Sequence, residues 1–358
     1  MNLLIIRPAA LGDSLMLMPS LCALKGMAET ILVGRWPGID FLAPYVHQAM
    51  DYEGHGWHLL YGDEKERVPH LSLPLLDLAV LFHSDPHGKM ASRLEDFLPG
   101  VQVRVFPGFP PAHTETHAAL YLALCLEASG CPINAAQAFE HAFEVPLLIY
   151  DAFLRNPKNA ERSLRALRQA QGKLAGGLIT VGISKRLPRR FAPRNDGLGL
   201  FTNPSEQNGL EQEVKRVIFH PGSGSAKKNH PPQFWLDFAR RFSQSHAFHL
   251  TLLLGPAEEA LLTFFQGHLQ GTATADILFC PDRAELLSSL SQAALYAGQD
   301  SGITHLAAMI GAPTLALFRS SSIARWRPLG PLVRTVKSEE SGPRLLDEAL
   351  SRAAELLR

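Results

Sequence analysis

The sequence predicts an α/β protein with parallel, doubly wound sheets that are divided between two domains. Short apolar runs bounded by Gly, Pro or polar residues, such as NLLIIR and HLTLLLG, are typical of strands buried on both faces. Segments with helical apolar spacing lie between these runs, and this alternation is typical of doubly wound sheets. A chain of 358 residues with 46% hydrophobic content is long enough for two cores of about 150 residues each.

The first half of the chain is expected to contain strands at residues 2–7 and 77–83, because both runs are short and apolar. Helical spacing predicts helices at residues 14–26 and 117–130. Gly130 is suited to end the second helix, since glycine commonly follows a helix C-terminus.

The second half of the chain repeats this alternation of strand and helix. Strands are expected at residues 216–220, 249–255 and 313–318. Helices are expected at residues 231–244, where two prolines open the pattern, at 284–295 and at 302–313.

The end of the chain predicts an amphipathic closing helix over residues 343–358. Pro343 lies near its first turn, where proline is tolerated. The apolar residues recur at spacings that put them on one face: Leu345, Leu346, Ala349, Leu350, Ala353, Leu356 and Leu357.

A change of composition marks the domain boundary. Residues 184–213 are rich in Pro, Gly, Asn and charge, and are longer than most connections inside a compact domain. We therefore predict an N-terminal domain over residues 1–195, a linker or flap over 196–213, a C-terminal domain over 214–342 and the closing helix. This region includes a basic cluster that is either a solvated linker or a contact for acceptor phosphates or anionic lipid: Lys185, Arg186, Arg189, Arg190 and Arg194.

Charge and cysteine content restrict the class of protein. Lys plus Arg and Asp plus Glu both number 34, so no overall field attracts the chain to nucleic acid, and we expect no such partner. Four cysteines occur without a CxxC pair, and the N-terminal residues lack the features of a signal peptide. The longest apolar segment, LSLPLLDLAVLF, is too short to span a bilayer. These features predict a cytoplasmic location.

Loops suited to anions follow several of the predicted strands. Gly12 and Asp13 interrupt the first apolar run, and Asp300, Ser301 and Gly302 follow another. The segment HPGSGSAKKNHPP, residues 220–232, combines glycines, hydroxyls and lysines. Ligands of open α/β sheets bind beyond the strand ends, where helix N-termini favour anions. The spacing is neither GxGxxG nor GxxxxGK[ST], so the segment predicts a phosphate site without predicting a dehydrogenase or a P-loop ATPase.

Four segments, in order and in spacing, resemble the ADP-heptose:lipopolysaccharide heptosyltransferases of glycosyltransferase family 9. These are IIRPAALGDSLMLMPSLCALK, VIFHPGSGSAKKNHPPQFWLDFARRF, LLLGPAEEALL, and DSGITHLAAMIGAPTLALF with ARWRPLG after it. The agreement covers the N-terminal unit and nearly the whole C-terminal half, whereas residues 50–215 match only loosely. Departures include His230 where tryptophan is usual and the segment LFRSSS where Gly-Pro usually follows the phenylalanine.

The resemblance implies a GT-B fold, in which two Rossmann-like domains face each other across a cleft. It implies transfer of heptose from ADP-heptose to the lipopolysaccharide inner core or a related glycolipid, with inversion at the anomeric carbon. It implies no cofactor and no obligatory metal, and the histidines and cysteines show no metal-binding spacing. Peripheral contact with the cytoplasmic face of the inner membrane is compatible with such an acceptor.

The resemblance also implies roles for the loop residues on the catalytic and diphosphate side. Asp13 matches the family's general base, with an N-cap carboxylate as the alternative. Lys228 matches the lysine that stabilises the leaving diphosphate, although Lys227 could take that role. Further donor-binding residues are expected around this lysine and in the Asp-Ser-Gly segment: Ser223, Gly224, Ser225, Asp300, Ser301, Gly302, Thr304 and His305. Asp300 is expected to orient its loop or to reach a sugar hydroxyl, since a carboxylate does not favour a neighbouring phosphate.

Two assignments concern the other ends of the substrates. Glu258 matches the family's ligand for the nucleoside ribose, and the adjacent Glu259 keeps this assignment open by one position. On the acceptor side the candidates are Gly12 and four residues that follow the strand at 77–83: His83, Asp85, His87 and Lys89.

Rival hypotheses remain open at this stage. The same fold could use another nucleotide hexose, or act as a GT-B epimerase. The departures at His230 and LFRSSS also allow a degenerate protein that binds nucleotide sugars without turnover.

Overall fold

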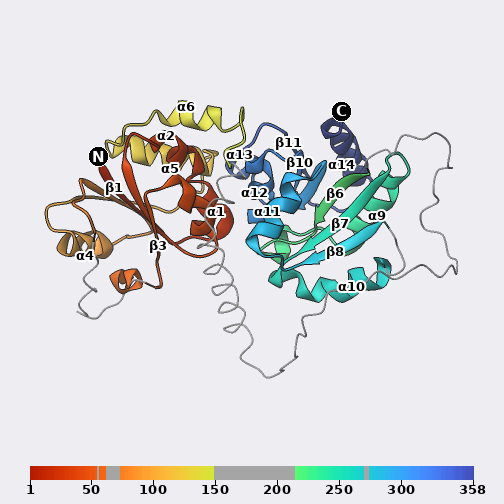
Figure 1. Cartoon of the computed structure of the whole chain (residues 1–358), viewed down its shortest axis with the longest axis horizontal. Helices are drawn as coiled ribbons and strands as arrows, with labels where there is room; N and C mark the ends of the chain where they lie inside the picture. The colour runs from red at the N-terminus through yellow and green to blue at the C-terminus, as the bar shows by residue number, and fades with distance from the viewer. Residues whose placement is uncertain (55, 62–72, 149–213, 270–273) are drawn as a thin grey trace, which may run out of the picture.

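A computed structural model describes residues 1–54, 56–61, 73–148, 214–269 and 274–358. These residues form two α/β lobes that lie side by side, the N-terminal lobe in red to yellow and the C-terminal lobe in green to blue (Figure 1). No helix in these ranges is long and apolar enough to cross a membrane. The predicted flap at 196–213 and the basic cluster between Lys185 and Arg194 lie outside the described residues.

The N-terminal sheet has the strand order β3-β2-β1-β4-β5, and its pairings are parallel. Its strands are β1 (Asn2–Arg7), β2 (Glu29–Gly34), β3 (Gln48–Asp51), β4 (Leu78–Phe82) and β5 (Gln102–Phe106). Both faces of β1 are covered: Leu3 and Ile5 pack in one apolar cluster, and Leu4 and Ile6 pack in another. The alternation of side chains along a strand therefore explains why the whole run is apolar.

Six described helices surround this sheet: α1 (Leu11–Leu15), α2 (Met18–Leu24), α3 (Gly38–Leu42), α4 (Lys89–Phe97), α5 (Ala118–Ala128) and α6 (Ala135–His141). Short 3₁₀ helices, η1 (Ala43–Tyr45) and η2 (Trp57–Tyr61), complete the lobe. The helix predicted at 14–26 is split, because α1 ends at Leu15 and α2 restarts with Pro19 in its first turn, where proline is tolerated. Asp13 consequently lies on a short helix of its own.

The C-terminal sheet has the strand order β11-β10-β9-β6-β7-β8, again with parallel pairings. Its strands are β6 (Lys215–His220), β7 (Phe248–Leu254), β8 (Ala275–Phe279), β9 (Leu295–Gln299), β10 (Thr314–Phe318) and β11 (Val333–Lys337). In both sheets the chain starts centrally, winds to one edge and returns to continue on the other side. This is the doubly wound topology that the sequence predicts.

The described helices of this lobe are α9 (Pro232–Ser243), α10 (Glu259–Leu269), α11 (Arg283–Ser291), α12 (Gly302–Ile310), α13 (Ile323–Trp326) and α14 (Pro343–Leu356). The 3₁₀ helices are η3 (Ala226–Lys228) and η4 (Pro256–Glu258). The prediction of helix through residue 295 is wrong at its end, since Leu295 already belongs to β9. Pairing of β9 with β6 and β10 in the sheet centre overrides the helical preference of this stretch.

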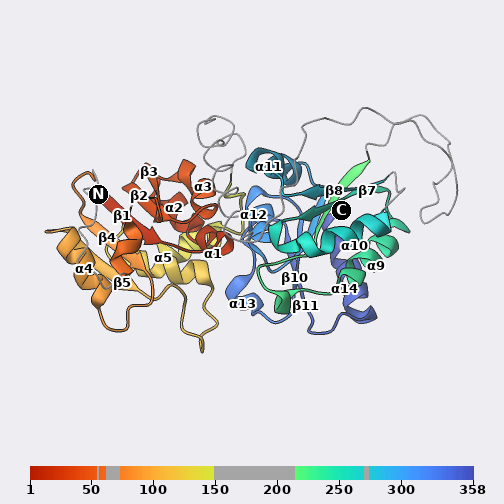
Figure 2. The same cartoon turned by 90° about the horizontal axis from the view of Figure 1, so that it is seen from below.

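The closing helix is confirmed. The predicted apolar residues of α14 pack in the second core cluster, against α9 and the β10–β11 side of the sheet. Figure 2 shows the same two lobes from below, with α12 of the C-terminal lobe directed at α1 of the N-terminal lobe.

The two lobes share a continuous apolar cluster. Leu15 and Leu42 of the N-terminal lobe belong to the same buried cluster as Leu286, Leu306 and Met309 of the C-terminal lobe. The backbone N–H of Leu148 also donates to the carbonyl of Met309 at 2.9 Å. The lobes are therefore packed together in this structure, and the carboxyl ends of β1, β6 and β9 lead to the seam between them.

Candidate active site

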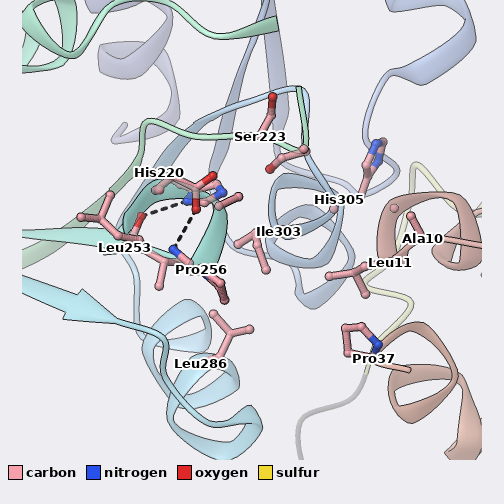
Figure 3. Close-up of a pocket in the computed structure, with 18 of the residues that line it drawn as sticks. Ala10, Leu11, Pro37, His220, Ser223, Leu253, Pro256, Leu286, Ile303 and His305 are labelled. Atoms are coloured by element: carbon pink, nitrogen blue, oxygen red, sulfur yellow. Dashed lines mark hydrogen bonds between the residues drawn. The ribbon is translucent and has the colours of Figure 1, made fainter. Parts of the chain in front are cut away.

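A cavity of about 620 Å³ lies at this seam and is lined by both lobes. Figure 3 shows Ala10, Leu11 and Pro37 of the N-terminal lobe on one side, facing His220, Pro256 and other residues of the C-terminal lobe. The loops after β1, β6 and β9 all reach the cavity. These are the places where ligands of doubly wound sheets bind.

The starts of two helices meet beside the cavity. Helix α1 packs against α12, and the closest approach joins Gly12 and Gly302. A Cβ atom on Gly302 would lie only 2.9 Å from the backbone nitrogen of Gly12. Gly302 therefore needs glycine for this contact, and a Cβ atom on Gly12 would also be close, 3.2 Å from Gly302 Cα.

Asp13 lines the cavity from the N-terminal lobe. The N-cap of α1 is Ala10, so the alternative interpretation of Asp13 as the N-cap residue is wrong. Burial raises the pKa of Asp13, Arg7 and Lys228 oppose this shift by their positive charge, and Asp300 adds to it. A carboxylate with a raised pKa is a better proton acceptor than an exposed one.

Arg7, at the end of β1, holds the segment that carries Asp13. Its Nε donates to the backbone oxygen of Asp13 at 3.1 Å and one terminal nitrogen donates to the carbonyl of Gly108 at 2.8 Å. The guanidinium is only 2% exposed, and burial lowers its pKa to about 10. Arg7 was not among the predicted site residues, although a charge that ends an otherwise apolar strand was a usable signal.

From the C-terminal lobe, Lys228 forms an ion pair with Asp300 in the same cavity. Lys228 Nζ donates to Asp300 Oδ2 at 2.7 Å, and the Asp300 side chain is 4% exposed. Ser321 Oγ donates to the same oxygen at 2.6 Å. Lys227 is exposed and is not among the residues that line the cavity, so the structure brings Lys228 rather than Lys227 to the site.

Helix α12 begins at the cavity. Ser301 is its N-cap, and its side chain accepts from the backbone N–H of Thr304 at 3.3 Å. Thr304 is fully buried, and its hydroxyl donates to the carbonyl of Gln299. This hydrogen bond stabilises the turn between β9 and α12. The free N–H groups of this helix start, at Gly302 and beyond, lie where an anion in the cavity could accept from them.

His305, in the first turns of α12, is a neutral side chain in this site. Burial lowers its pKa to about 4, and the Asp300 carboxylate, 3.9 Å from Nε2, opposes this shift. A neutral imidazole adds a hydrogen-bonding group to the cavity without adding charge.

The loop after β6 also lines the site, through Ser223, Gly224 and Lys228. Ser223 donates to Asn229 Oδ1 at 2.6 Å and thereby closes the loop that carries Lys228. Gly224 lines the cavity, whereas Ser225 caps η3 and is not among the lining residues. His230 is buried, with Nδ1 2.8 Å from Ser341 Oγ, so this departure from the family pattern is accommodated by packing behind the loop.

Glu258 is buried and lines the cavity from the C-terminal lobe. Its Oε2 accepts from the backbone N–H of Gly255 at 2.8 Å, and its carboxylate lies against Gly222, where a Cβ would be 2.0 Å from Oε1. His220 lines the same part of the cavity and donates from Nδ1 to the carbonyl of Leu253 at 2.9 Å (Figure 3). Glu259 begins α10 and is not among the lining residues, which favours Glu258 as the cavity carboxylate.

Some predicted residues are not brought together by the structure. His83 and Lys89 do not line this cavity. Ser321 and Trp326 were also not predicted as site residues, and neither was the pair formed by Asp40 and Arg283, which joins the two lobes at the cavity. Contacts between segments so far apart in the chain leave no local signal in the sequence.

In the described part of the chain, no group of three or more His, Cys, Asp or Glu residues is arranged to hold a metal ion. The polar groups that line the cavity include the carboxylate of Asp13 from the N-terminal lobe, and Lys228 with the start of α12 from the C-terminal lobe. This arrangement suits removal of a proton from a hydroxyl and stabilisation of a departing anion.

Comparison with known proteins gives a consistent result. Residues 160–349 match the family model described as glycosyltransferase family 9 (heptosyltransferase). No curated protein sequence matches the chain significantly.

Several solved structures superpose over nearly the whole chain. The glycosyltransferase family 9 protein of Veillonella parvula has a TM-score of 0.62 at 14% identity, covering 99% of this chain and 96% of that one. The E. coli heptosyltransferase WaaC with ADP has a TM-score of 0.64 at 12% identity, covering 99% and 100%. The E. coli ADP-heptose lps heptosyltransferase II has a TM-score of 0.59 at 16% identity, covering 100% and 98%. At these identities the superpositions confirm the GT-B fold.

Proposed function

The chain belongs to glycosyltransferase family 9 and is a glycosyltransferase, and from this premise we propose that it transfers heptose from ADP-heptose to the lipopolysaccharide inner core or a related glycolipid. The observation that carries the proposal is the placement of Asp13 and the Lys228–Asp300 pair, which come from different lobes, on one cavity.

In the proposed reaction Asp13 is the general base. The acceptor hydroxyl oxygen attacks the anomeric carbon of the donor, and the carboxylate of Asp13 takes the hydroxyl proton. The bond between the anomeric carbon and the diphosphate oxygen breaks with its electron pair on the diphosphate. Attack from the Asp13 side, opposite the leaving group, inverts the anomeric configuration.

The leaving diphosphate is assigned to the C-terminal lobe. Lys228 and the N-terminus of α12 supply positive charge and N–H donors from the C-terminal lobe to the cavity that Asp13 lines from the N-terminal lobe. Glu258 has one carboxylate oxygen engaged with Gly255, and we assign the other, which lies against Gly222, to a ribose hydroxyl. We propose that neither a metal nor a cofactor takes part.

The acceptor is assigned to the N-terminal lobe around Gly12 and Asp13. A glycolipid acceptor requires work at a membrane surface, so we propose peripheral association with the cytoplasmic face of the inner membrane. His83 and Lys89 stay candidates for acceptor contacts outside the cavity.

Calorimetric titration of the purified protein with ADP, UDP and GDP, each with magnesium and with a chelator, tests the donor assignment. We expect ADP to bind most tightly and to bind equally well with chelator. Preference for UDP or GDP would move the enzyme to another sugar donor, and a requirement for magnesium would contradict the metal-independent mechanism.

A further inference from the structure

The segment after β10 is one of the places where the chain departs from the family pattern. Its residues read Arg319, Ser320, Ser321 and Ser322. Arg319 donates to the carbonyl of Asn229 at 2.9 Å, next to Lys228, and to the carbonyl of Glu339 at 3.1 Å. Ser321 donates to Asp300 Oδ2 at 2.6 Å. The segment therefore contacts both the loop that carries the lysine and the carboxylate that holds it.

We propose that Ser321 is a positioning residue that fixes Asp300 and thereby sets the direction of the Lys228 ammonium for the donor diphosphate. The inference rests on the proposed function, because it takes the diphosphate as the ligand of Lys228.

The geometry of Asp300 carries the argument. Its side chain is 4% exposed, so a carboxylate that lacked partners here would be strongly destabilised. Its Oδ2 receives two short hydrogen bonds, 2.7 Å from Lys228 and 2.6 Å from Ser321. With Ser321 in place, rotation of the carboxylate away from the lysine breaks both bonds at once.

Lys228 can serve Asp300 and a diphosphate together. An ammonium group has three N–H donors, and one of them is used by Asp300. The other two remain for phosphate oxygens, and their directions follow from the bond to Asp300. The side chain is 36% exposed, so it borders the space that a ligand enters and depends on Asp300 for a fixed orientation.

Substitution of Ser321 tests the inference, and substitution of its neighbour Ser320 serves as the control. The affinity for ADP, measured by calorimetry, is the readout. We expect Ser321→Ala to weaken ADP binding roughly tenfold, the effect of losing one hydrogen bond to a charged group. Ser320→Ala removes an exposed hydroxyl one residue away and should leave the affinity unchanged. Ser321→Thr keeps the donor and should restore binding.

A double-mutant comparison separates positioning from general loosening of the fold. In a Lys228→Ala background, Ser321→Ala should cause no further loss of ADP affinity. An equal loss in both backgrounds, or wild-type affinity in Ser321→Ala, would overturn the inference. Ser321→Cys keeps the side-chain size with a weaker donor and gives the same comparison if the alanine variant is unstable. Absence of nucleotide binding by the wild-type protein would instead overturn the proposed function, and the inference with it.

Discussion

Asp13 is the residue whose proposed role is the easiest to isolate. Replacement of its carboxylate by the amide in Asp13→Asn removes the proton acceptor and leaves the C-terminal nucleotide site intact. We expect turnover to fall by roughly a hundredfold or more, with ADP affinity nearly unchanged by calorimetry. A variant that keeps wild-type turnover would show that another group is the base.

Lys228 and Lys227 form a matched pair, since both lie in η3 but only Lys228 lines the cavity. Lys228→Ala should weaken ADP binding and reduce the rate, because it removes the charge that faces the leaving diphosphate. Lys227→Ala should change neither quantity. If titrations and steady-state kinetics showed a loss in Lys227→Ala but not in Lys228→Ala, Lys227 would be the lysine that binds the diphosphate.

The raised pKa of Asp13 predicts how kcat/KM depends on pH on the acidic side of its pH profile. The base must be ionised to accept a proton, so kcat/KM should rise with pH through a pKa above the usual value of about 3.9 for aspartate. The charge of Arg7 lowers the pKa of Asp13, so Arg7→Met should move this limb to higher pH and Arg7→Lys should leave it near its original position. A limb that does not move in Arg7→Met would separate Asp13 from the observed titration.

At the scale of residues, the local parts of the site could be predicted from sequence. The Gly-Asp and Asp-Ser-Gly breaks and the serine-lysine loop are continuous segments, and each of them contributes residues to the cavity. Ser321, Arg7 and the Asp40–Arg283 pair could not be predicted in these roles, because each acts through a residue distant in the chain. Their partners are set by packing of the two lobes.

The pair of helix starts at α1 and α12 gives a prediction at the scale of elements. A methyl group in Gly302→Ala would meet the backbone of Gly12 at 2.9 Å, and a backbone atom cannot move aside as a flexible side chain can. We expect the lobes to be forced apart at this point and kcat/KM to fall by about tenfold or more.

Gly267→Ala is the matched control for this substitution. Gly267 lies in α10, outside the cavity, and an added Cβ there meets nothing within 4 Å. Alanine is favoured over glycine within a helix, so this variant should retain activity. Equal activities of the two variants in the same assay would contradict a functional contact between α1 and α12.

Secondary structure could be predicted where a run was apolar throughout or kept one helical spacing from end to end. Strands β1, β6, β7 and β10 and helices α12 and α14 lie at the expected places. The division between α11 and β9 was wrong because the stretch SQAALYAGQ has no local signal that separates helix from a central strand. Only its place between β6 and β10 decides the outcome.

At the scale of the whole molecule, one ion pair spans the seam beside the cavity. Arg283, at the start of α11, donates to Asp40 of α3, and the two side chains are 9% and 1% exposed. Asp40→Asn removes the negative charge that faces this buried arginine, and the loss of one partner of a buried ion pair is destabilising.

We therefore expect Asp40→Asn to open the lobes and to weaken ADP binding, as measured by the radius of gyration in solution X-ray scattering and by calorimetry. The double exchange Asp40→Arg with Arg283→Asp restores opposite charges and should recover part of both quantities. A radius of gyration identical to that of the wild type in Asp40→Asn would rule out a role of the pair in closing the cavity.

Buried histidines predict how the molecule responds to acid. Burial lowers the pKa of His117 and of His305 from 6.5 to about 4. The unfolded chain binds these protons more readily than the folded one. The contribution of the two neutral histidines to the free energy of unfolding is therefore fully present above about pH 6.5 and is lost as the pH falls towards 4. His117 joins the lobes, since Nε2 donates to the carbonyl of Arg327 at 2.9 Å and Nδ1 accepts from the N–H of Ala119.

Urea unfolding at pH 7 and pH 5 measures this effect. The free energy of unfolding should fall less between these values in His117→Gln than in the wild type, because Gln does not titrate. His113→Gln, which changes an exposed histidine, should behave as the wild type does. Equal falls in all three proteins would contradict the assigned cause.

The most direct test of the central claim is a transfer assay with ADP-heptose and a lipopolysaccharide acceptor that lacks inner-core heptose. It would be run with chelator present on the wild type and on Asp13→Asn. We predict that the wild type releases ADP and forms a glycosidic linkage of inverted anomeric configuration, and that Asp13→Asn forms almost none. Transfer only from another nucleotide sugar, or equal transfer by Asp13→Asn, would contradict the account.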